Sequence, residues 1–147
     1  MKIKIDLKLK DNLIEIKEDT EITEVLIARN SDEIKSRIEF IHKRPNLKSR
    51  INIKVVVFDQ ARFDLEGILK IYKGAKGTDT YLKINCLIMG ERAYARAIPS
   101  LEIQESDVKA GHGATIGYLD AESMYYLKSK GLDRLTTEKL LVEAFLK

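Results

Sequence analysis

His112 is the residue with the clearest chemical potential, because it stands between two glycines, Gly111 and Gly113. Glycine on both sides permits unusual backbone angles and lets a ligand or another chain approach closely. A neutral imidazole binds iron well and can transfer protons near neutral pH. The local sequence therefore allows two interpretations: a metal or proton-transfer site, or a histidine in a tight turn before a helix with no chemical role.

Cys86 is the one cysteine of the chain, so it can neither form an internal disulfide nor complete a metal site alone. Such a residue is usually a small buried side chain in a reducing cytoplasm. One cysteine and two distant histidines also fall short of the four ligands that zinc prefers. The sequence shows no phosphate-binding loop and no nucleophile elbow. We therefore expect a soluble cytoplasmic protein.

Positive charge is concentrated in residues 42–54, which contain no acidic residue. The cations of this basic stretch are Lys43, Arg44, Lys48, Arg50 and Lys54. They could contact a phosphate backbone, but no exposed aromatic residues alternate with them as in single-strand binders. The whole chain has 26 basic and 23 acidic residues, a net charge of +3 that does not by itself indicate nucleic-acid binding. We interpret the stretch as a solvated face.

Alternating apolar and polar residues predict short β-strands over most of the first 117 residues. The expected strands are residues 3–9, 13–16, 22–28, 34–41, 51–57, 68–72, 82–88, 93–98 and 101–103. A helix is the alternative for 34–41. The N-terminal alternation of lysine with apolar residues does not suit a signal peptide, and no apolar run is long enough to span a membrane.

Turn signals and small residues add detail to this pattern. Asp11 and Asn12 are expected to form a turn, and Pro99 is expected to interrupt a strand. Alanines at 93, 95 and 97 occupy alternate positions, which suits a narrow interior. Such a series of strands fits a sandwich, a barrel or a β-solenoid. The sequence has no clean fixed-period repeat, so periodicity does not distinguish these three architectures.

The last thirty or so residues are predicted to form a helical hairpin. Asp120 and Asp133 suit the N-cap positions of two helices, because their carboxylates can accept hydrogen bonds from free backbone N–H groups. Gly131 suits the end of the first helix. Leu141 and Phe145 repeat at a spacing of four residues, as on one face of a helix.

Four segments resemble, in the same order, the SufB/SufD family of iron–sulfur cluster assembly proteins. They are HKRPNLKSR (residues 42–50), FDLEGILKIYKGAKGTDTY (63–81), IPSLEIQESDVKAGHGATIGYLD (98–120) and YYLKSKGLDRLTTEKLLVEAF (125–145). The resemblance implies a mainly β fold, a short right-handed parallel β-helix over residues 1–117, followed by a C-terminal α-helical segment over residues 118–147. Residues 1–41 match the family weakly, and the long N-terminal region of ordinary members is lacking.

The resemblance also implies partners. In this family two cores pair through the end of the β-helix, as a heterodimer of paralogues or a homodimer, and the helical part docks onto SufC, an ABC-type ATPase. A histidine in the position of His112 lies near the pairing interface and contributes to assembly of a transient iron–sulfur cluster. A short solenoid also exposes an open end that favours an oligomer. We expect no membrane partner.

Three positions depart from the more reactive members of the family. Gly113 stands where SufB-type members tend to carry glutamate, which is closer to the SufD pattern, and Ala110 stands where SufD-like members often have cysteine. The functional cysteine of SufB-like members falls near Ile84, two residues before Cys86 on the same strand face. The chain is therefore identified as a SufD-like, N-terminally short member in which His112 is half of a site completed by a partner chain.

The leading hypothesis is a scaffold or accessory subunit that is not itself an enzyme. Its cluster-site or interface residues would be His112, Cys86, Gly111 and Gly113, with His112 and Cys86 as candidate metal ligands. Its contacts with the ATPase would include Lys128, Arg134 and Lys139. The alternatives are a homodimer that holds a cluster between His112 and Cys86 of two chains, a degenerate paralogue, and a basic-patch nucleic-acid binder without cluster chemistry.

Overall fold

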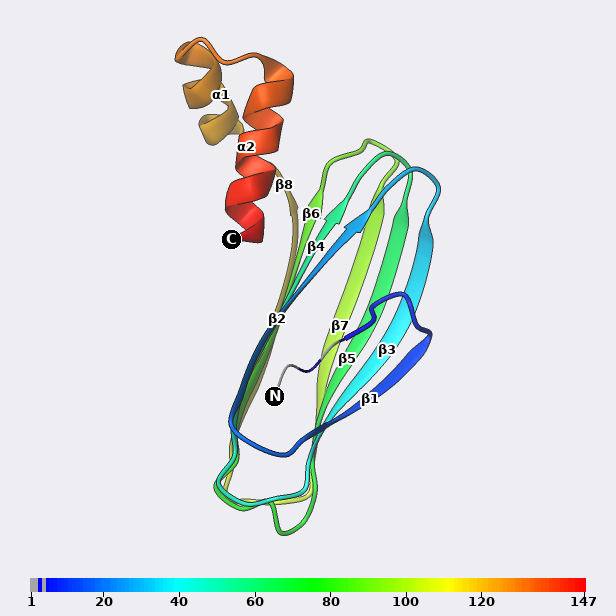
Figure 1. The fold of residues 1–147 in the computed structure, drawn as a ribbon, viewed down its shortest axis with the longest axis vertical. Coiled ribbons are helices and arrows are strands. Elements are labelled where there is room, and N and C mark those ends of the chain that lie inside the picture. Colours follow the sequence, from blue (N-terminus) through cyan, green and yellow to red (C-terminus); the bar gives the residue numbers. More distant parts are fainter. Residues whose placement is uncertain (1–2, 4) are drawn as a thin grey trace.

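The computed structural model describes residues 3 and 5–147, which contain eight β-strands followed by two α-helices (Figure 1). The strands are β1 (Asp11–Ile16), β2 (Thr20–Ala28), β3 (Glu33–His42), β4 (Lys48–Val57), β5 (Arg62–Ile71), β6 (Asp79–Ile88), β7 (Tyr94–Ile103) and β8 (Lys109–Tyr118). The helices are α1 (Ala121–Ser129) and α2 (Arg134–Leu146). No helix among the described residues is long and apolar enough to cross a membrane.

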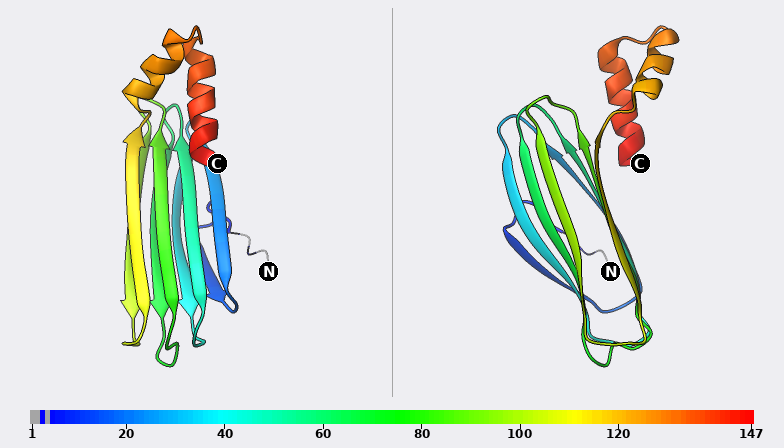
Figure 2. Two further views of the ribbon diagram at one scale, coloured as in Figure 1. Left: turned by 90° about the vertical axis from the view of Figure 1, so that its left-hand side faces the viewer. Right: turned by 180° about the vertical axis from the view of Figure 1, so that it is seen from behind.

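The strands form two parallel four-stranded sheets that face one another (Figures 1 and 2). One sheet has the order β1-β3-β5-β7 and the other β2-β4-β6-β8. Successive strands alternate between the sheets, so two strands complete one turn of a right-handed parallel β-solenoid. The predicted β-helix is confirmed, and the segment 34–41 is a strand.

The length of one solenoid turn varies along the chain. Paired residues are separated by 26 positions between Asp11 and Arg37, and by 32 positions between Arg62 and Tyr94. The strands differ little in length after β1, so the variation lies mainly in the corners. A search for a fixed period therefore misses the repeat, although each turn has the same structure.

The core lies between the two sheets, where inward-facing side chains of successive turns stack on one another. Ile53 of β4 and Ile84 of β6 are neighbours in register and fully buried. Gly67 of β5 provides room for the opposite sheet, because a Cβ there would lie 2.8 Å from Cδ2 of Leu82. On the next turn, Ala97 faces inward beside Leu65, as expected for a narrow interior.

The N-terminal segment differs from the expected strand at 3–9. Its described residues, 3 and 5–9, form no strand, because the Asp6 carboxylate accepts the Lys8 N–H and its carbonyl accepts the Leu9 N–H, both at 3.0 Å, which makes a turn. Ile5 and Leu7 are instead buried in the core. The predicted turn at residues 11–12 is also wrong, because both residues begin β1 and pair with β3.

Pro99 does not interrupt a strand. It lies inside the continuous strand β7, in register with Gly67. In a central strand nearly every N–H donates to a neighbouring strand, and proline has no N–H to donate. In an edge strand the N–H groups that point away from the sheet have no strand partner, so a proline at such a position removes no hydrogen bond. Since β7 is the last strand of its sheet, proline is tolerated there.

Both helices of the hairpin begin at the predicted N-caps, and the first helix stops at the predicted glycine. The carboxylates of Asp120 and Asp133 accept the N–H groups of Ser123 at 2.9 Å and Thr136 at 2.7 Å. Gly131 has a φ of 91°, which suits the turn between the helices. Figure 2 shows α2 lying over the outer face of the β2-β4-β6-β8 sheet, near the end at which these strands finish.

Candidate functional site

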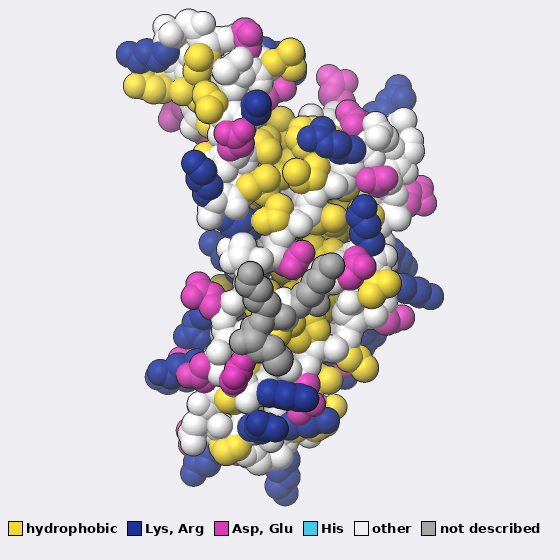
Figure 3. All heavy atoms as spheres, in the orientation of Figure 1, with side chains coloured by type: hydrophobic (Ala, Val, Ile, Leu, Met, Phe, Trp, Pro, Cys, Tyr) yellow, Lys and Arg dark blue, Asp and Glu magenta, His cyan; other side chains and the backbone are white. Residues whose placement is uncertain are grey.

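The candidate site is the end of the solenoid formed by β7 and β8, which we call the open end. These are the last strands of their sheets, so one backbone edge of each has no strand partner within the described residues. Inward-facing side chains of β7 and β8 are exposed there: Ile103 is 45%, Ile116 44% and Tyr118 75% exposed. At the opposite end, viewed in Figure 3, the N-terminal segment contributes Ile5 and Leu7 to the core.

His112 lies in the middle of β8, not in a turn. Its register partner on β6 is Leu82, which points inward and is fully buried. Side chains in register on neighbouring strands point to the same face of a sheet, so His112 also points inward. It is exposed because no further solenoid turn among the described residues covers it. The interpretation of His112 as a turn residue before a helix is therefore wrong.

The two flanking glycines have an explanation other than unusual backbone angles. Neither Gly111 nor Gly113 has a positive φ, and both face outward. A Cβ on Gly111 would lie 3.0 Å from ring carbons of Tyr81, and a Cβ on Gly113 would lie 3.0 Å from its hydroxyl oxygen. The glycines make room for the Tyr81 ring, a role that local sequence does not reveal because the tyrosine comes from the preceding turn.

Cys86 faces inward from β6 and is only 3% exposed. Burial raises the pKa of its thiol to about 12, so the thiol is protonated and a poor metal ligand in this state. Its register partner on β8 is Ile116, four residues beyond His112. Four residues correspond to about 13 Å along a strand, so one chain does not bring Cys86 and His112 to the same metal ion.

No group of three or more His, Cys, Asp or Glu side chains in the described part of the chain is arranged to hold a metal ion. At the open end, His112 is therefore the candidate ligand that a partner can reach. Gly111 and Gly113 flank it on β8, and the Tyr81 ring of the preceding turn covers the outer side of both glycines.

A second histidine, His42, is part of a buried polar chain that sequence reasoning missed as a site. His42 Nδ1 lies 3.3 Å from the Lys70 carbonyl oxygen, which can only accept, so Nδ1 carries the hydrogen. Nε2 then accepts from the Ser49 hydroxyl at 2.9 Å, and Ser49 accepts from Thr80 at 2.6 Å. All three side chains are buried, and the burial lowers the pKa of His42.

This chain of hydrogen bonds predicts a loss of stability in mild acid. Below about pH 6.5 the unfolded protein binds a proton at His42 that the folded protein excludes, so unfolding becomes easier as the pH falls. We expect the free energy of unfolding to decrease by up to about 1.4 kcal/mol per pH unit as the pH falls from about 6.5 toward the lowered pKa of His42 in the folded protein. Urea unfolding as a function of pH measures this slope.

The matched variants are His42→Gln, which should remove the slope in that pH range, and His112→Gln, which keeps His42 and should keep it. Glu39 and Asp120 do not contribute at this pH, because the hydrogen bond from Lys70 lowers the pKa of Glu39 and the hydrogen bond from Ser123 lowers that of Asp120. An unchanged slope in His42→Gln would show that another group carries the acid sensitivity.

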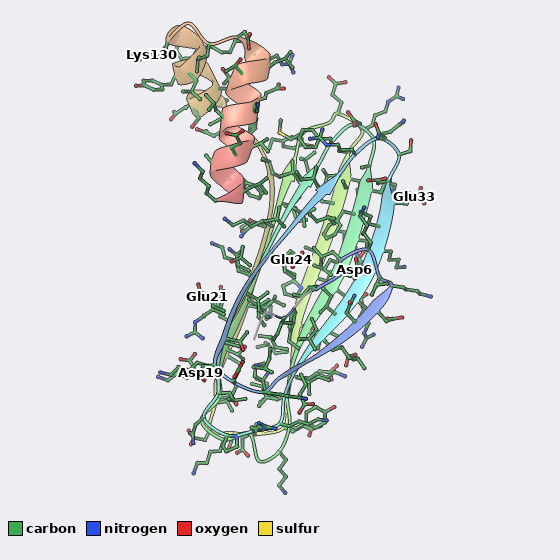
Figure 4. All side chains as sticks on the ribbon, in the orientation of Figure 1. Asp6, Asp19, Glu21, Glu24, Glu33 and Lys130 are labelled. Atoms are coloured by element: carbon green, nitrogen blue, oxygen red, sulfur yellow. The ribbon has the colours of Figure 1, made fainter. Side chains whose placement is uncertain are left out.

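The candidate ATPase-binding cations all lie on the surface of the hairpin. Lys128 of α1 and Arg134 and Lys139 of α2 are exposed, and Arg134 donates to the Glu138 carboxylate at 2.8 Å. Lys128 also lines a cleft of about 820 Å³ between α1 and the corner after β6. Figure 4 shows Lys130 at the outer tip of the hairpin.

The hairpin also exposes large apolar side chains that sequence reasoning did not single out. Tyr125 and Leu135 are each 78% exposed, and Tyr126 is 59% exposed. α1 contains no buried residue, and the one buried residue of α2 is Thr137. Since an isolated hairpin gains little stability from so little burial, its surface is suited to contact with another protein.

Comparison with known proteins identifies the family. Residues 7–145 match the model of the SUF system FeS cluster assembly SufBD core domain. The chain belongs to the SufB/SufD family. The chain is 35% identical over 104 residues to the iron–sulfur cluster assembly protein SufD of Escherichia coli K12, covering 71% of this chain and 25% of that protein. With SufD of Bacillus subtilis 168 the identity is 32% over 122 residues, covering 83% of this chain and 28% of that protein.

The chain thus spans about a quarter of the length of these curated relatives. The matched residues 7–145 include both the open end and the helical hairpin. Both candidate surfaces therefore lie within the part of the chain that defines the family.

Proposed function

We propose that this protein is a non-catalytic scaffold or accessory subunit of a cytoplasmic iron–sulfur cluster assembly complex. Its β-solenoid would pair with a second SufB/SufD-type core, and its helical hairpin would bind a SufC-type ABC ATPase. The observation that carries the proposal is the open end, where two free strand edges, exposed apolar side chains and His112 occur together. The family match supports the assembly role.

Pairing follows from the physics of strand edges. A free parallel edge with apolar inward-facing side chains is a template for another chain, and soluble proteins generally cover or pair it. β7 and β8 belong to different sheets but end the solenoid at the same place. A second core with the same two edges could satisfy both at once in a two-fold arrangement, either as a paralogue or as another copy of this chain.

His112 would then lie at the seam between the two cores. Its imidazole can ligate iron or transfer a proton, and ligands from the partner would complete a site for the cluster, which is the cargo of the complex. Cys86 faces the same interior but is covered by Ile116 on the next turn. It would serve as a ligand only if the end of β8 moved away, so His112 is the first candidate.

The test is anaerobic co-expression with a SufC-type ATPase and a SufB-type paralogue from the same source, followed by affinity purification through this chain. We expect both proteins to co-purify and the visible absorption of an iron–sulfur cluster to appear. His112→Ala should retain both partners and lose most of the absorption, because it removes a ligand without adding bulk. A chain purified without either partner would overturn the proposal, whereas a coloured homodimer would favour the alternative of a cluster-holding homodimer.

A further inference from the structure

The outer face of the β2-β4-β6-β8 sheet has an unusual distribution of charge. Its outward-facing cations come from three neighbouring strands, and we call this surface the basic face. They are Lys48, Arg50, Lys54, Lys83 and Lys109. The acidic residues that point outward from the strands of this sheet are Asp79 on β6 and Glu21 on β2. Figure 4 shows Glu21 projecting from β2, the strand at the far edge of the sheet from β8.

The other sheet neutralises its charges internally. On its outer face Lys70 contacts Glu39 at 2.9 Å and Glu102 at 3.2 Å. Arg96 contacts Asp64 at 3.0 Å. Most cations of that face therefore already have an anionic neighbour in the folded protein, so they have little attraction left for a partner.

The basic face does not neutralise itself in this way. Arg50 contacts Asp79 at 2.9 Å, but within the described residues no acidic side chain pairs with Lys48, Lys54, Lys83 or Lys109. Like charges held together on a rigid sheet create a positive potential that attracts anions. The basic stretch predicted to be a solvated face supplies only part of this surface, because Lys83 and Lys109 come from later turns.

Tyr81 lies at the centre of the basic face and shapes it. Arg50, Tyr81 and Gly111 are direct neighbours across three strands. Shallow depressions of about 260 Å³ and 340 Å³ lie on either side of the ring, one reaching Lys83 and the other Lys109. The Tyr81 ring lies over Gly111 and Gly113, so an extended chain on this face would contact the ring and the lysines beside it.

We propose that the basic face binds an extended acidic segment of a partner protein. Side chains on one face of an extended peptide repeat about every 6.6 Å, which is also the spacing of same-face residues along these strands. Alternate Asp or Glu side chains can therefore meet Lys48, Arg50 and Lys54, or the lysines beside Tyr81. A single-stranded nucleic acid fits less well, because stacking of successive bases requires several exposed aromatic rings and this face offers Tyr81 alone.

The test uses the full chain and a fluorescent synthetic peptide in which glutamate alternates with threonine. We expect binding by fluorescence anisotropy that weakens with added salt. The double variant Lys83→Gln, Lys109→Gln should bind about tenfold more weakly, since each exposed ion pair contributes a few-fold. The matched control Lys10→Gln, Lys35→Gln removes the same charge near the other sheet and should bind like wild type.

Two further probes distinguish the outcomes. A peptide with the same number of glutamates in one block should bind more weakly than the alternating peptide, because its carboxylates do not match the strand spacing. Oligo-dT should bind more weakly than the alternating peptide, and tighter binding of oligo-dT would overturn the assignment in favour of a nucleic acid. If Lys10→Gln, Lys35→Gln lost as much binding as Lys83→Gln, Lys109→Gln, the assignment of the site to the basic face would also be overturned. None of these measurements requires pairing at the open end or an ATPase. A negative result would therefore count against peptide binding at the basic face and not against the proposed function.

Discussion

A chain carrying Ala97→Arg and Ala114→Arg should stay monomeric and should not pair with a SufB-type paralogue. Both alanines face inward at the open end, in register with the buried Leu65 and Ile84. In the free chain Ala114 is exposed and Ala97 is half-buried, so both arginines can reach solvent past the last turn, and far-UV circular dichroism checks that the fold remains intact. Sedimentation velocity over a range of concentrations, with and without the paralogue, measures the result.

The effect should be large because pairing would bury both charges without partners. An uncompensated buried charge costs about 3–5 kcal/mol. Two arginines therefore raise the dissociation constant by at least about a thousandfold, and self-pairing doubles the number of charges at the interface. Few single interactions at a strand edge could offset such a cost.

Ser100→Arg is the matched control for this prediction. Ser100 lies on the same edge strand but faces outward, in register with Ile68. It adds the same charge and bulk to β7 without entering the seam, so pairing should persist. If the double variant pairs as tightly as Ser100→Arg, the open end is not the pairing surface and the proposed architecture is wrong.

Strands could be predicted where the alternation of apolar and polar residues in the sequence matches the alternation of buried and exposed side chains. In β4 and β6 every second residue is buried, and all of these except Ser49 and Thr80 are apolar, so both strands and their inward faces follow from the sequence. The N-terminal segment shows the same alternation but forms no strand in its described residues. Here the Asp6 turn and the burial of Ile5 and Leu7 decide the structure, and these are tertiary effects that periodicity does not report.

The candidate site was only partly predictable for a related reason. His112 could be found from its glycine neighbours and from the family pattern, but its place on an edge strand depends on pairing with β6, thirty residues earlier in the chain. The same pairing explains the glycines through Tyr81 and separates His112 from Cys86. Contacts between successive turns thus determine the geometry of the site, and the irregular turn length conceals them in the sequence.

The second large effect is expected at the helical hairpin. The double variant Tyr125→Ala, Leu135→Ala should bind a SufC-type ATPase at least about thirtyfold more weakly, because large apolar anchors at an interface commonly contribute 2 kcal/mol or more. Both side chains are 78% exposed, so their removal leaves no internal cavity, and alanine favours the helix. Biolayer interferometry with the immobilised ATPase measures the dissociation constant.

Two further variants separate apolar contacts from charge at this surface. Replacing Lys128, Arg134 and Lys139 by alanine should weaken binding by about tenfold and reduce its salt dependence, since exposed ion pairs contribute about 0.2–1 kcal/mol each. Glu143→Ala, an exposed change on the same helix, should have no effect. If the charge variant abolished binding and the apolar variant did not, electrostatic attraction would be the main source of affinity, and the exposed tyrosine and leucine would need another partner. We expect the apolar variant to have the larger effect. An ATPase that covered the hairpin would remove far more apolar surface from water at Tyr125 and Leu135 than at the cations.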